Sequence, residues 1–232
     1  MLIKMSIDFV MMILMIVQMA YRFTGNMLHE ILGISLFILF IIHNILNRKW
    51  YKSMFKVKMN MRRILNIAVN LLFMVMMILL ILSAIPISRT VFAFMNIHIE
   101  GFNAREIHTL AAYWGLIIMS VHIGMHCEMI IGRVRKMMRK TDKSLIRIII
   151  LRILTLLIVI YGVKVSFDRN IGSKLILYYT FDMWNSDESF IKLFLDYLSI
   201  VGVYVCGTYY VMKVAFQNKM IIQGGINNVR KF

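Results

Sequence analysis

The sequence predicts an all-α membrane protein in which about six transmembrane helices form a bundle. Of its 232 residues, 60% are hydrophobic and only one is proline. A soluble domain of this size would be much less apolar. Six apolar stretches approach or reach the roughly 20 residues that a helix needs to cross a bilayer. They cover residues 4–22, 27–46, 64–86, 107–131, 145–165 and 194–215.

Each stretch is predicted as one unbroken helix. The first lacks a small-residue cleavage site after its apolar part, so we interpret it as a retained span and not as a signal peptide. The short segment at residues 23–26 predicts a tight turn, which makes the first two spans an antiparallel hairpin. The third span ends at the only proline, Pro86. Basic or mixed-charge segments separate the last three spans.

Positive charge is concentrated in two of the predicted loops. The chain carries a net charge of +16, and the segments after the second and fourth spans are strongly basic, whereas segments 87–106 and 164–192 are balanced. The positive-inside rule then places both chain ends in the cytoplasm, with the second and fourth spans running from outside to inside. Nucleic-acid binding is disfavoured, because the sequence lacks the basic, aromatic-rich surface expected for it. The basic residues are Arg48, Lys49, Lys52, Lys56, Lys58, Arg62 and Arg63, then Arg133, Arg135, Lys136, Arg139, Lys140, Lys143 and Arg147.

Four histidines occupy the second and fourth spans in the same pattern. His29 and His43 are 14 residues apart, and so are His108 and His122. Fourteen residues make roughly four helical turns, about 21 Å, so each pair shares one face of its helix. Because the two spans are predicted to be parallel, His29 is level with His108 near the outer face, and His43 with His122 near the inner face. A polar side chain inside a membrane span is a functional hypothesis by default.

Two stacked pairs of imidazoles are typical of a di-haem b-type cytochrome. Two histidines per iron leave no open position, which suits electron transfer better than oxygen chemistry. The 14-residue step is too long for both histidines of one helix to bind a single metal ion. For any one histidine, the alternative is a core residue hydrogen-bonded to a neighbouring helix. The two cysteines form neither C-x-x-C-H nor C-x-x-C, which disfavours c-type haem, zinc and iron–sulfur sites.

Small and basic residues complete the predicted cofactor-binding set. Gly33 and Gly115 would let a macrocycle approach a helix backbone, or would serve ordinary close packing of membrane helices. Arg89 and Arg105 would neutralise the propionates of an outer haem, or would anchor the protein at the surface.

Several other polar residues are left with open roles. His126 is an alternative inner ligand, a propionate partner or an interfacial residue. His98, in an outer loop with Glu100, serves a quinol head group or is simply solvated. Asp8 and Gln18, in the first span, are candidates for bonds across helices, and we assign them no chemistry.

Two segments also resemble a known family. Residues 21–56, which contain MLHEILGISLFILFIIHNIL, resemble the first signature of the bacterial flavinylation-associated cytochromes, a family long described as a domain of unknown function. Residues 105–126, REIHTLAAYWGLIIMSVHIGMH, resemble its second signature. The stretches YGVKVSFDRNIGSKLI and FLDYLSIVGVYV resemble the C-terminal part of longer members. The resemblance therefore covers nearly the whole chain.

The resemblance implies a multi-helix b-type cytochrome in a prokaryotic cytoplasmic membrane. It implies that His29, His43, His108 and His122 are the haem ligands. It also implies work alongside extracytosolic proteins that carry covalently bound flavin. The outer segments of this chain are too short for a flavin-attachment domain, so the flavoprotein is expected to be a separate partner.

Together these observations predict a transmembrane electron-transfer cytochrome with two non-covalent b haems. Electrons would pass from the quinol pool, or from a cytoplasmic-side donor, to an extracytoplasmic acceptor. We predict one polytopic membrane domain over residues 1–232, with a haem-binding core in 1–131 and additional helices and an outer loop in 132–232. The alternatives are a metal-ion or haem transporter, which would need broken helices along a polar path, and a non-redox membrane anchor. No motif locates the quinol site that would make the chain a subunit of a quinol-linked oxidoreductase.

Overall fold

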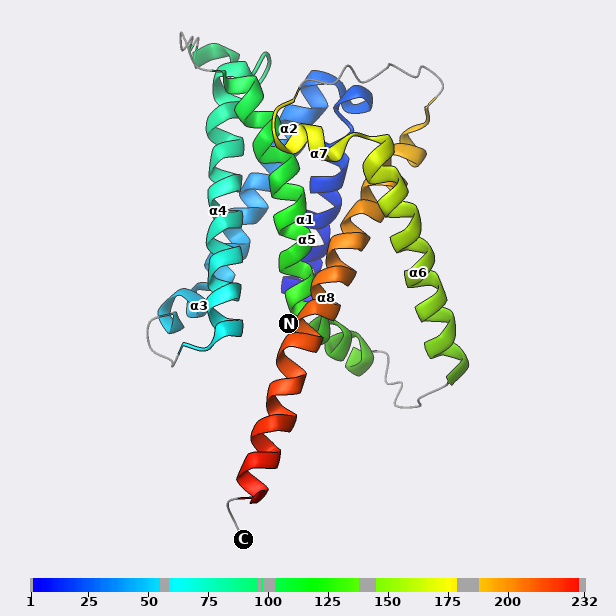
Figure 1. The fold of residues 1–232 in the computed structure, drawn as a ribbon. Helices are drawn as coiled ribbons and strands as arrows, with labels where there is room; N and C mark the ends of the chain where they lie inside the picture. Colours follow the sequence, from blue (N-terminus) through cyan, green and yellow to red (C-terminus); the bar gives the residue numbers. More distant parts are fainter. Residues whose placement is uncertain are drawn as a thin grey trace.

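The computed structural model describes residues 2–54, 59–95, 97, 103–137, 145–178 and 188–229, with side chains to residue 216 (Figure 1). This part of the chain is mainly helical and contains no strand, which confirms the predicted all-α class. Its helices are α1 (Leu2–Gln18), α2 (Tyr21–Leu46), α3 (Arg48–Ser53), α4 (Met61–Ile87), the 3₁₀ turn η1 (Ala93–Met95), α5 (Ala104–Met137), α6 (Leu145–Asp168), α7 (Ile171–Leu175) and α8 (Phe190–Val229).

Five helices within the described residues are long and apolar enough to cross a membrane. They are α2, α4, α5, α6 and the segment Phe190–Phe216 of α8, and they match the second to sixth predicted spans. The first predicted span becomes α1, which has 17 residues and lies at the short end of the range of about 17–25 that a crossing helix needs. Its side chain Ile16 is fully buried against the bundle. The chain is therefore a multi-pass membrane protein.

The chain reverses between α1 and the long part of α2 at the turn that the sequence predicts. Gly25, inside the predicted turn at residues 23–26, leaves helical geometry with φ 61° and ψ −173°, so the range of α2 joins two helical pieces across a kink. Before the kink, the backbone N–H groups of Met19 and Ala20 donate to the carbonyls of Ile16 and Val17 at 3.1 and 2.9 Å. Glycine adopts the conformation at the kink without a steric penalty.

The predicted antiparallel hairpin of α1 and α2 is present. Lys4, near the start of α1, donates to the carbonyl of Leu46 at the end of α2, at 2.7 Å. Gln18, at the end of α1, donates to the carbonyl of His29 near the start of α2, at 3.0 Å. The two helices thus run side by side over the length of α1.

Helix α5 is the most enclosed of the five long helices and organises the others. It packs antiparallel to α4, because Ser83 near the end of α4 contacts His108 near the start of α5, whereas Asn70 near the start of α4 contacts His122 further along α5. The stretch from Gly115 to Ser120 is buried without interruption. Four helices, α1, α2, α4 and α5, therefore surround the predicted histidine positions.

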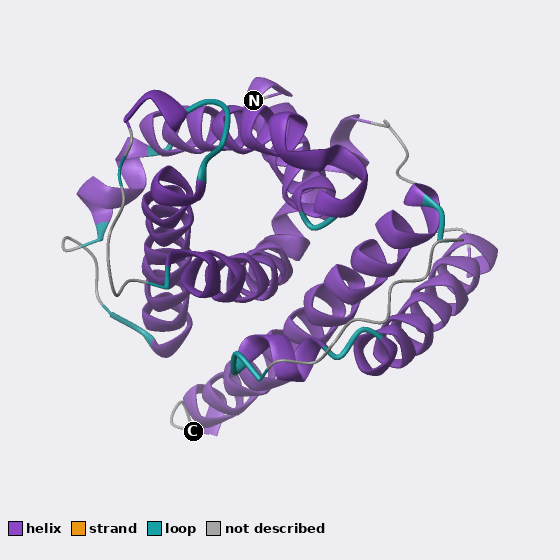
Figure 2. Ribbon diagram, turned by 90° about the horizontal axis from the view of Figure 1, so that it is seen from above, coloured by secondary structure: helices purple, strands orange, loops and turns teal. Residues whose placement is uncertain are grey.

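Helices α6 and α8 form a second, antiparallel pair beside these four (Figure 2). A small residue allows their close approach: a Cβ on Gly162 of α6 would lie 2.4 Å from the carbonyl oxygen of Ser199 on α8. Helix α8 in turn packs on α5, where a Cβ on Gly124 would lie 2.7 Å from the carbonyl oxygen of Val205. Close backbone contact at small residues is a usual basis of helix packing in membranes.

A cluster of charges fixes one end of this pair. Arg169, just after α6, donates through Nε to Asp196 of α8 at 2.9 Å and also pairs with Glu188. Arg22, in α2, pairs with Glu188 as well, at 3.4 Å. Burial alone would lower the pKa of Arg169, but its hydrogen bonds to the two carboxylates raise that pKa above the usual value. The cluster ties α6 and α8 to the α1–α2 hairpin.

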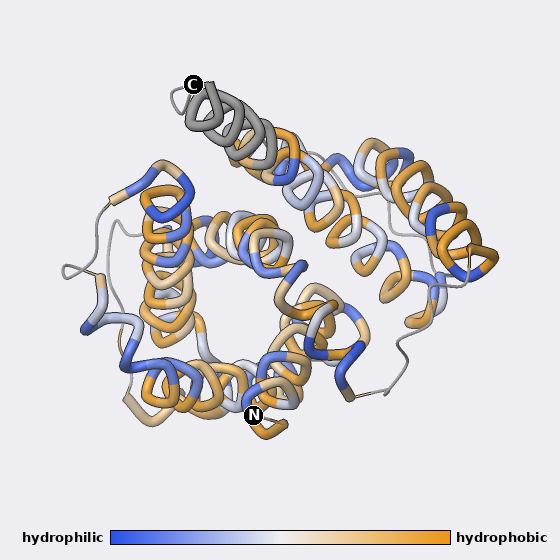
Figure 3. The backbone as a smooth tube through the Cα atoms, turned by 90° about the horizontal axis from the view of Figure 1, so that it is seen from below, coloured by the Kyte–Doolittle hydropathy of each residue, from blue (hydrophilic) through white to orange (hydrophobic). Residues whose placement is uncertain are grey.

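The long helices consist mainly of hydrophobic residues (Figure 3), and many of their large apolar side chains are exposed. On α6, for example, Ile150, Leu154 and Leu157 are each more than half exposed. Such a surface is suited to lipid. The end of α2, the start of α4, the end of α5 and the start of α6 lie at the same end of the bundle, so the two basic segments emerge together (Figure 1).

Candidate functional site

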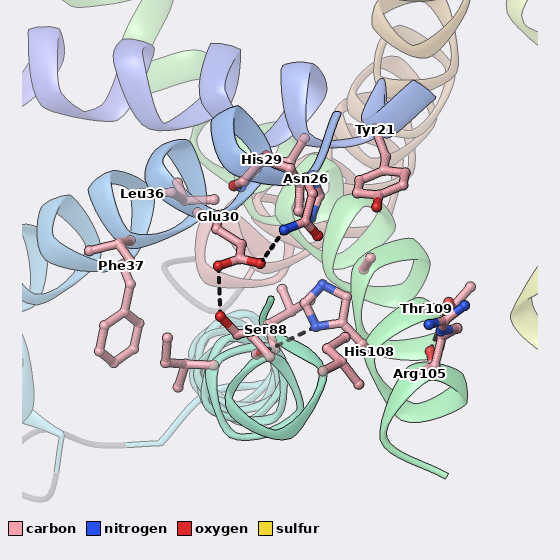
Figure 4. Close-up of a pocket in the computed structure, with 18 of the residues that line it drawn as sticks. Tyr21, Asn26, His29, Glu30, Leu36, Phe37, Ser88, Arg105, His108 and Thr109 are labelled. Carbon is pink, nitrogen blue, oxygen red and sulfur yellow. Dashed lines mark hydrogen bonds between the residues drawn. The ribbon is translucent and has the colours of Figure 1, made fainter. Parts of the chain in front are cut away.

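Helices α2 and α5 bring His29 and His108 together at one cavity. The centres of the two rings are 6.2 Å apart. The cavity has a volume of about 540 Å³, and both histidines line it together with mainly apolar side chains of α1, α2, α4 and α5. Figure 4 shows the two histidines on neighbouring helices at this cavity. The volume lies within the range of roughly 300–1,000 Å³ that is usual for small-molecule and cofactor sites.

The imidazole of His108 is held by α4. Its Nδ1 lies 3.1 Å from the carbonyl oxygen of Leu80 and 3.1 Å from the hydroxyl of Ser83. A carbonyl oxygen only accepts, so this contact assigns the proton of the neutral ring to Nδ1. The hydroxyl of Ser83 is itself directed to the carbonyl of Leu79, at 2.6 Å. The Nε2 atom of His108 is therefore left unprotonated, which is the form that binds a metal.

Glu30, next to His29, anchors the rim of the cavity, a role that no pattern in the sequence indicates. Its carboxylate accepts hydrogen bonds from the segment that follows α4, which includes the cavity residues Ser88 and Arg89 (Figure 4). These bonds fix the end of α4 against α2. The donors are the Asn26 amide, the Ser88 and Thr90 hydroxyls, and the backbone N–H groups of Arg89, Thr90 and Val91.

The two predicted arginines lie at the same rim. Arg89 and Arg105 both line the cavity, and both residues are exposed. They provide the only guanidinium groups among the residues that line it within the described part of the chain. The cavity thus has an apolar interior and a positively charged rim at the end of the bundle opposite to the basic segments.

His43 and His122 form an inner group on the same two helices. Nδ1 of His43 lies 2.7 Å from a carboxylate oxygen of Asp8 on α1, and Nδ1 of His122 lies 2.7 Å from the side-chain oxygen of Asn70 on α4. The two histidines are also close enough to interact electrostatically. Because His29 meets His108 near one end of the two helices and His43 lies within electrostatic range of His122 further along them, α2 and α5 run parallel, as the sequence predicts.

His126 belongs to this inner group. Its ring centre is 4.8 Å from that of His122, one helical turn earlier in α5. It also interacts electrostatically with His43 and Asp8. Its predicted role as a ligand, a propionate partner or an interfacial residue stays open. His98 and Glu100 lie outside the described residues.

A row of aromatic rings connects the outer cavity to the inner group. Phe37 lines the cavity and stacks on Phe40, with ring centres 6.4 Å apart. Phe40 contacts Phe73 of α4 at 6.2 Å, and Phe73 contacts the ring of His122 at 6.2 Å. Phe40 is buried, with 8% of its surface exposed. Aromatic side chains therefore pack along this row between the two histidine pairs.

The two predicted glycines lie in different surroundings. Gly33 lines the cavity, and a Cβ there would lie 2.7 Å from the amide nitrogen of Gln18. A Cβ on Gly115 would instead lie 3.1 Å from the terminal methyl of Met15, with Leu80 and Met76 next nearest. Gly115 thus serves close packing between α5 and its neighbours α1 and α4.

The partners of the histidines come from α1 and α4. Asp8 and Gln18 of α1 form the bonds across helices for which the sequence makes them candidates, whereas nothing in the sequence predicts Ser83 and Asn70 of α4 as partners. Each is a polar residue inside an otherwise apolar span, which is the only signal in the sequence that marks them. Periodicity does not reveal which helix each of them faces.

Two searches, one for metal-binding groups among the described residues and one for similar proteins, give negative results. Within the described ranges, no group of three or more histidine, cysteine, aspartate or glutamate side chains is arranged to hold a metal ion. Comparisons with protein families, with curated proteins and with solved structures find no match to the chain.

Proposed function

We propose that this protein is a di-haem b-type cytochrome that transfers electrons across a membrane. His29 and His108 would hold an outer haem, and His43 and His122 an inner one. Electrons would come from the quinol pool or from a cytoplasmic-side donor. They would leave to an extracytoplasmic acceptor, which we take to be a flavoprotein from the family resemblance of residues 21–56 and 105–126.

The observation that carries the proposal is the meeting of His29 and His108 at one cavity. Bonds between a metal and an imidazole nitrogen are about 2.0–2.1 Å long, so two imidazoles that hold one metal have ring centres up to roughly 6 Å apart. The ring centres of His29 and His108 are 6.2 Å apart. This separation supports a pair of histidine ligands at the cavity.

The hydrogen bonds of the ring nitrogens support the same function. Metal-binding histidines usually donate their second ring N–H to a carboxylate, a carbonyl or a similar acceptor, which fixes the ring and raises its basicity. His108, His43 and His122 each have Nδ1 next to such an acceptor, on Leu80, Asp8 and Asn70. In these three histidines the same ring nitrogen, Nδ1, makes the contact.

The remaining residues would serve binding and insulation. Haem, when bound, supplies a reversible one-electron couple of its iron. Arg89 and Arg105 at the rim would bind the propionates, and the apolar lining would exclude water from the macrocycle. The packed row of Phe37, Phe40 and Phe73 would keep the space between the two haems free of water.

The proposal is tested by substituting the four histidines one at a time with leucine in the full-length protein. Replacing His29 or His108 is expected to remove the outer haem only, and replacing His43 or His122 the inner haem only. Haem content per chain and the reduced absorption spectrum measure both effects. His126→Leu, on the same face of α5, distinguishes the two candidates for the inner ligand: retention of both haems supports His122, and loss of the inner haem would assign that ligand to His126. Retention of both haems in all four single variants would refute the ligand assignment.

A further inference from the structure

We propose that Gln18 is the positioning residue of His29, accepting a hydrogen bond from its Nδ1. This inference rests on the proposed function. Gln18 ends α1 and lines the outer cavity together with His29. Its amide nitrogen donates to the backbone carbonyl of His29 at 3.0 Å, so the two residues are already joined.

The orientation of the Gln18 amide follows from that bond. A backbone carbonyl only accepts, so the NH₂ group of Gln18 has to face it, and the amide cannot be flipped. The side-chain oxygen is then left as an acceptor. This oxygen is buried and has no hydrogen-bond partner among the described residues.

His29 carries the complementary atom. Its Nδ1 is likewise buried without a partner within the described part of the chain. A buried polar atom without a partner costs about 1–3 kcal/mol, so two of them on joined residues are expected to satisfy each other. The contact can be direct or through one water molecule. In either form the Gln18 oxygen would accept the proton of Nδ1 and leave Nε2 of His29 for the metal.

The Nδ1 atoms of the other three histidines each have a partner on a neighbouring helix, which supports a partner for Nδ1 of His29 as well. Nδ1 faces Leu80 in His108, Asp8 in His43 and Asn70 in His122. Asp8 and Gln18 both come from α1, and each faces the α2 histidine nearest to it. The first helix would thus orient both histidines of α2, as α4 orients both histidines of α5.

Gly33 gains a second role from this arrangement. It lies one turn after His29, and a Cβ there would come within 2.7 Å of the Gln18 amide nitrogen. A side chain at this position would therefore push Gln18 away from His29. Gly33→Ala is expected to reproduce, in milder form, the effect of removing the Gln18 amide.

The test separates positioning from simple packing by the midpoint potential of the outer haem. An acceptor on Nδ1 makes a histidine more basic and favours the oxidised iron. Gln18→Glu keeps an acceptor and strengthens it, so it is expected to lower the potential. Gln18→Met removes the acceptor at similar size, so it is expected to raise the potential and to weaken retention of the outer haem about 10- to 100-fold.

The experiment is a redox titration of the full-length, haem-loaded protein, with the outer component identified as the one that His29→Leu lacks. The inner component is the internal control and is expected to stay unchanged in both variants. Opposite shifts of the outer component support the inference. Equal shifts in one direction, or no shift in either variant, would overturn it while leaving the haem assignment intact. A wild-type protein without haem would overturn the proposed function itself.

Discussion

At the scale of single residues, the histidines are distinguished by their partners more than by their positions. The bond between His122 and Asn70 is the clearest case, because both side chains come from long, mainly apolar helices and lie 2.7 Å apart. An asparagine side chain inside an apolar span is unfavourable unless its amide forms a hydrogen bond. In Asn70 the amide oxygen forms this bond with Nδ1 of His122 and so orients the imidazole ring.

We therefore expect Asn70→Leu to weaken the inner site selectively. Loss of an outer partner of a metal-binding histidine typically reduces affinity about 10- to 100-fold. The measurement is the rate of haem transfer from each site to an excess of an apo-haemoprotein that captures the released haem. Asn66→Leu is the matched control, one turn earlier in α4, because the side-chain oxygen of Asn66 has no partner among the described residues. Equal haem loss in both variants would speak against the role given to Asn70.

At the scale of helices, two kinds of contact hold the bundle together. Polar bonds at the histidine sites join α1 to α2 and α4 to α5, whereas α6 and α8 meet through small residues and a charge cluster at one end. The contact at Gly162 is the closest, because the neighbouring atom is the backbone oxygen of Ser199, which has little freedom to move.

Gly162→Ala is expected to separate α6 from α8 and to destabilise the protein by about 1–3 kcal/mol, as overpacking usually does. Gly207→Ala on α8 is the control, since a Cβ there meets nothing within 4 Å. This control should be neutral or slightly stabilising, because alanine favours a helix more than glycine by up to about 1 kcal/mol. Thermal unfolding in one detergent compares the two variants. The account of the α6–α8 interface fails if their stabilities are equal.

At the scale of the whole molecule, the basic segments share one end of the bundle and the outer cavity lies toward the other. The positive-inside rule predicts that the basic end faces the cytoplasm. The outer histidine pair would then lie near the extracytoplasmic surface, where an acceptor outside the membrane could reach it.

This orientation is tested with single cysteines in a background in which Cys127 and Cys206 are replaced by serine. Asn103→Cys, at the start of α5, is expected to react with a membrane-impermeant maleimide in intact cells. Lys52→Cys, in α3, is expected to react only after the cells are opened. Both residues are exposed. The reverse labelling pattern would show that the bundle is inserted the other way.

The sequence predicts the long helices well, because the bilayer sets their length and composition. It also predicts the pairing of His29 with His108, because a fixed 14-residue step on two parallel helices leaves few alternatives. It also predicts the turn between the first two spans at residues 23–26, where Gly25 interrupts the helix. It does not predict that Asn70, and not Asn66, serves His122, since that choice depends on the rotation of α4 about its own axis.

The most direct test of the central claim is the dithionite-reduced minus oxidised absorption spectrum of the purified wild-type protein, with haem counted per chain. The account predicts sharp b-type bands and about two haems per chain, one for each histidine pair. One haem per chain would mean that one histidine pair binds haem and that the other pair has only a structural role. A colourless protein, after expression with ample haem, would contradict the cytochrome function and favour a transporter or a membrane anchor.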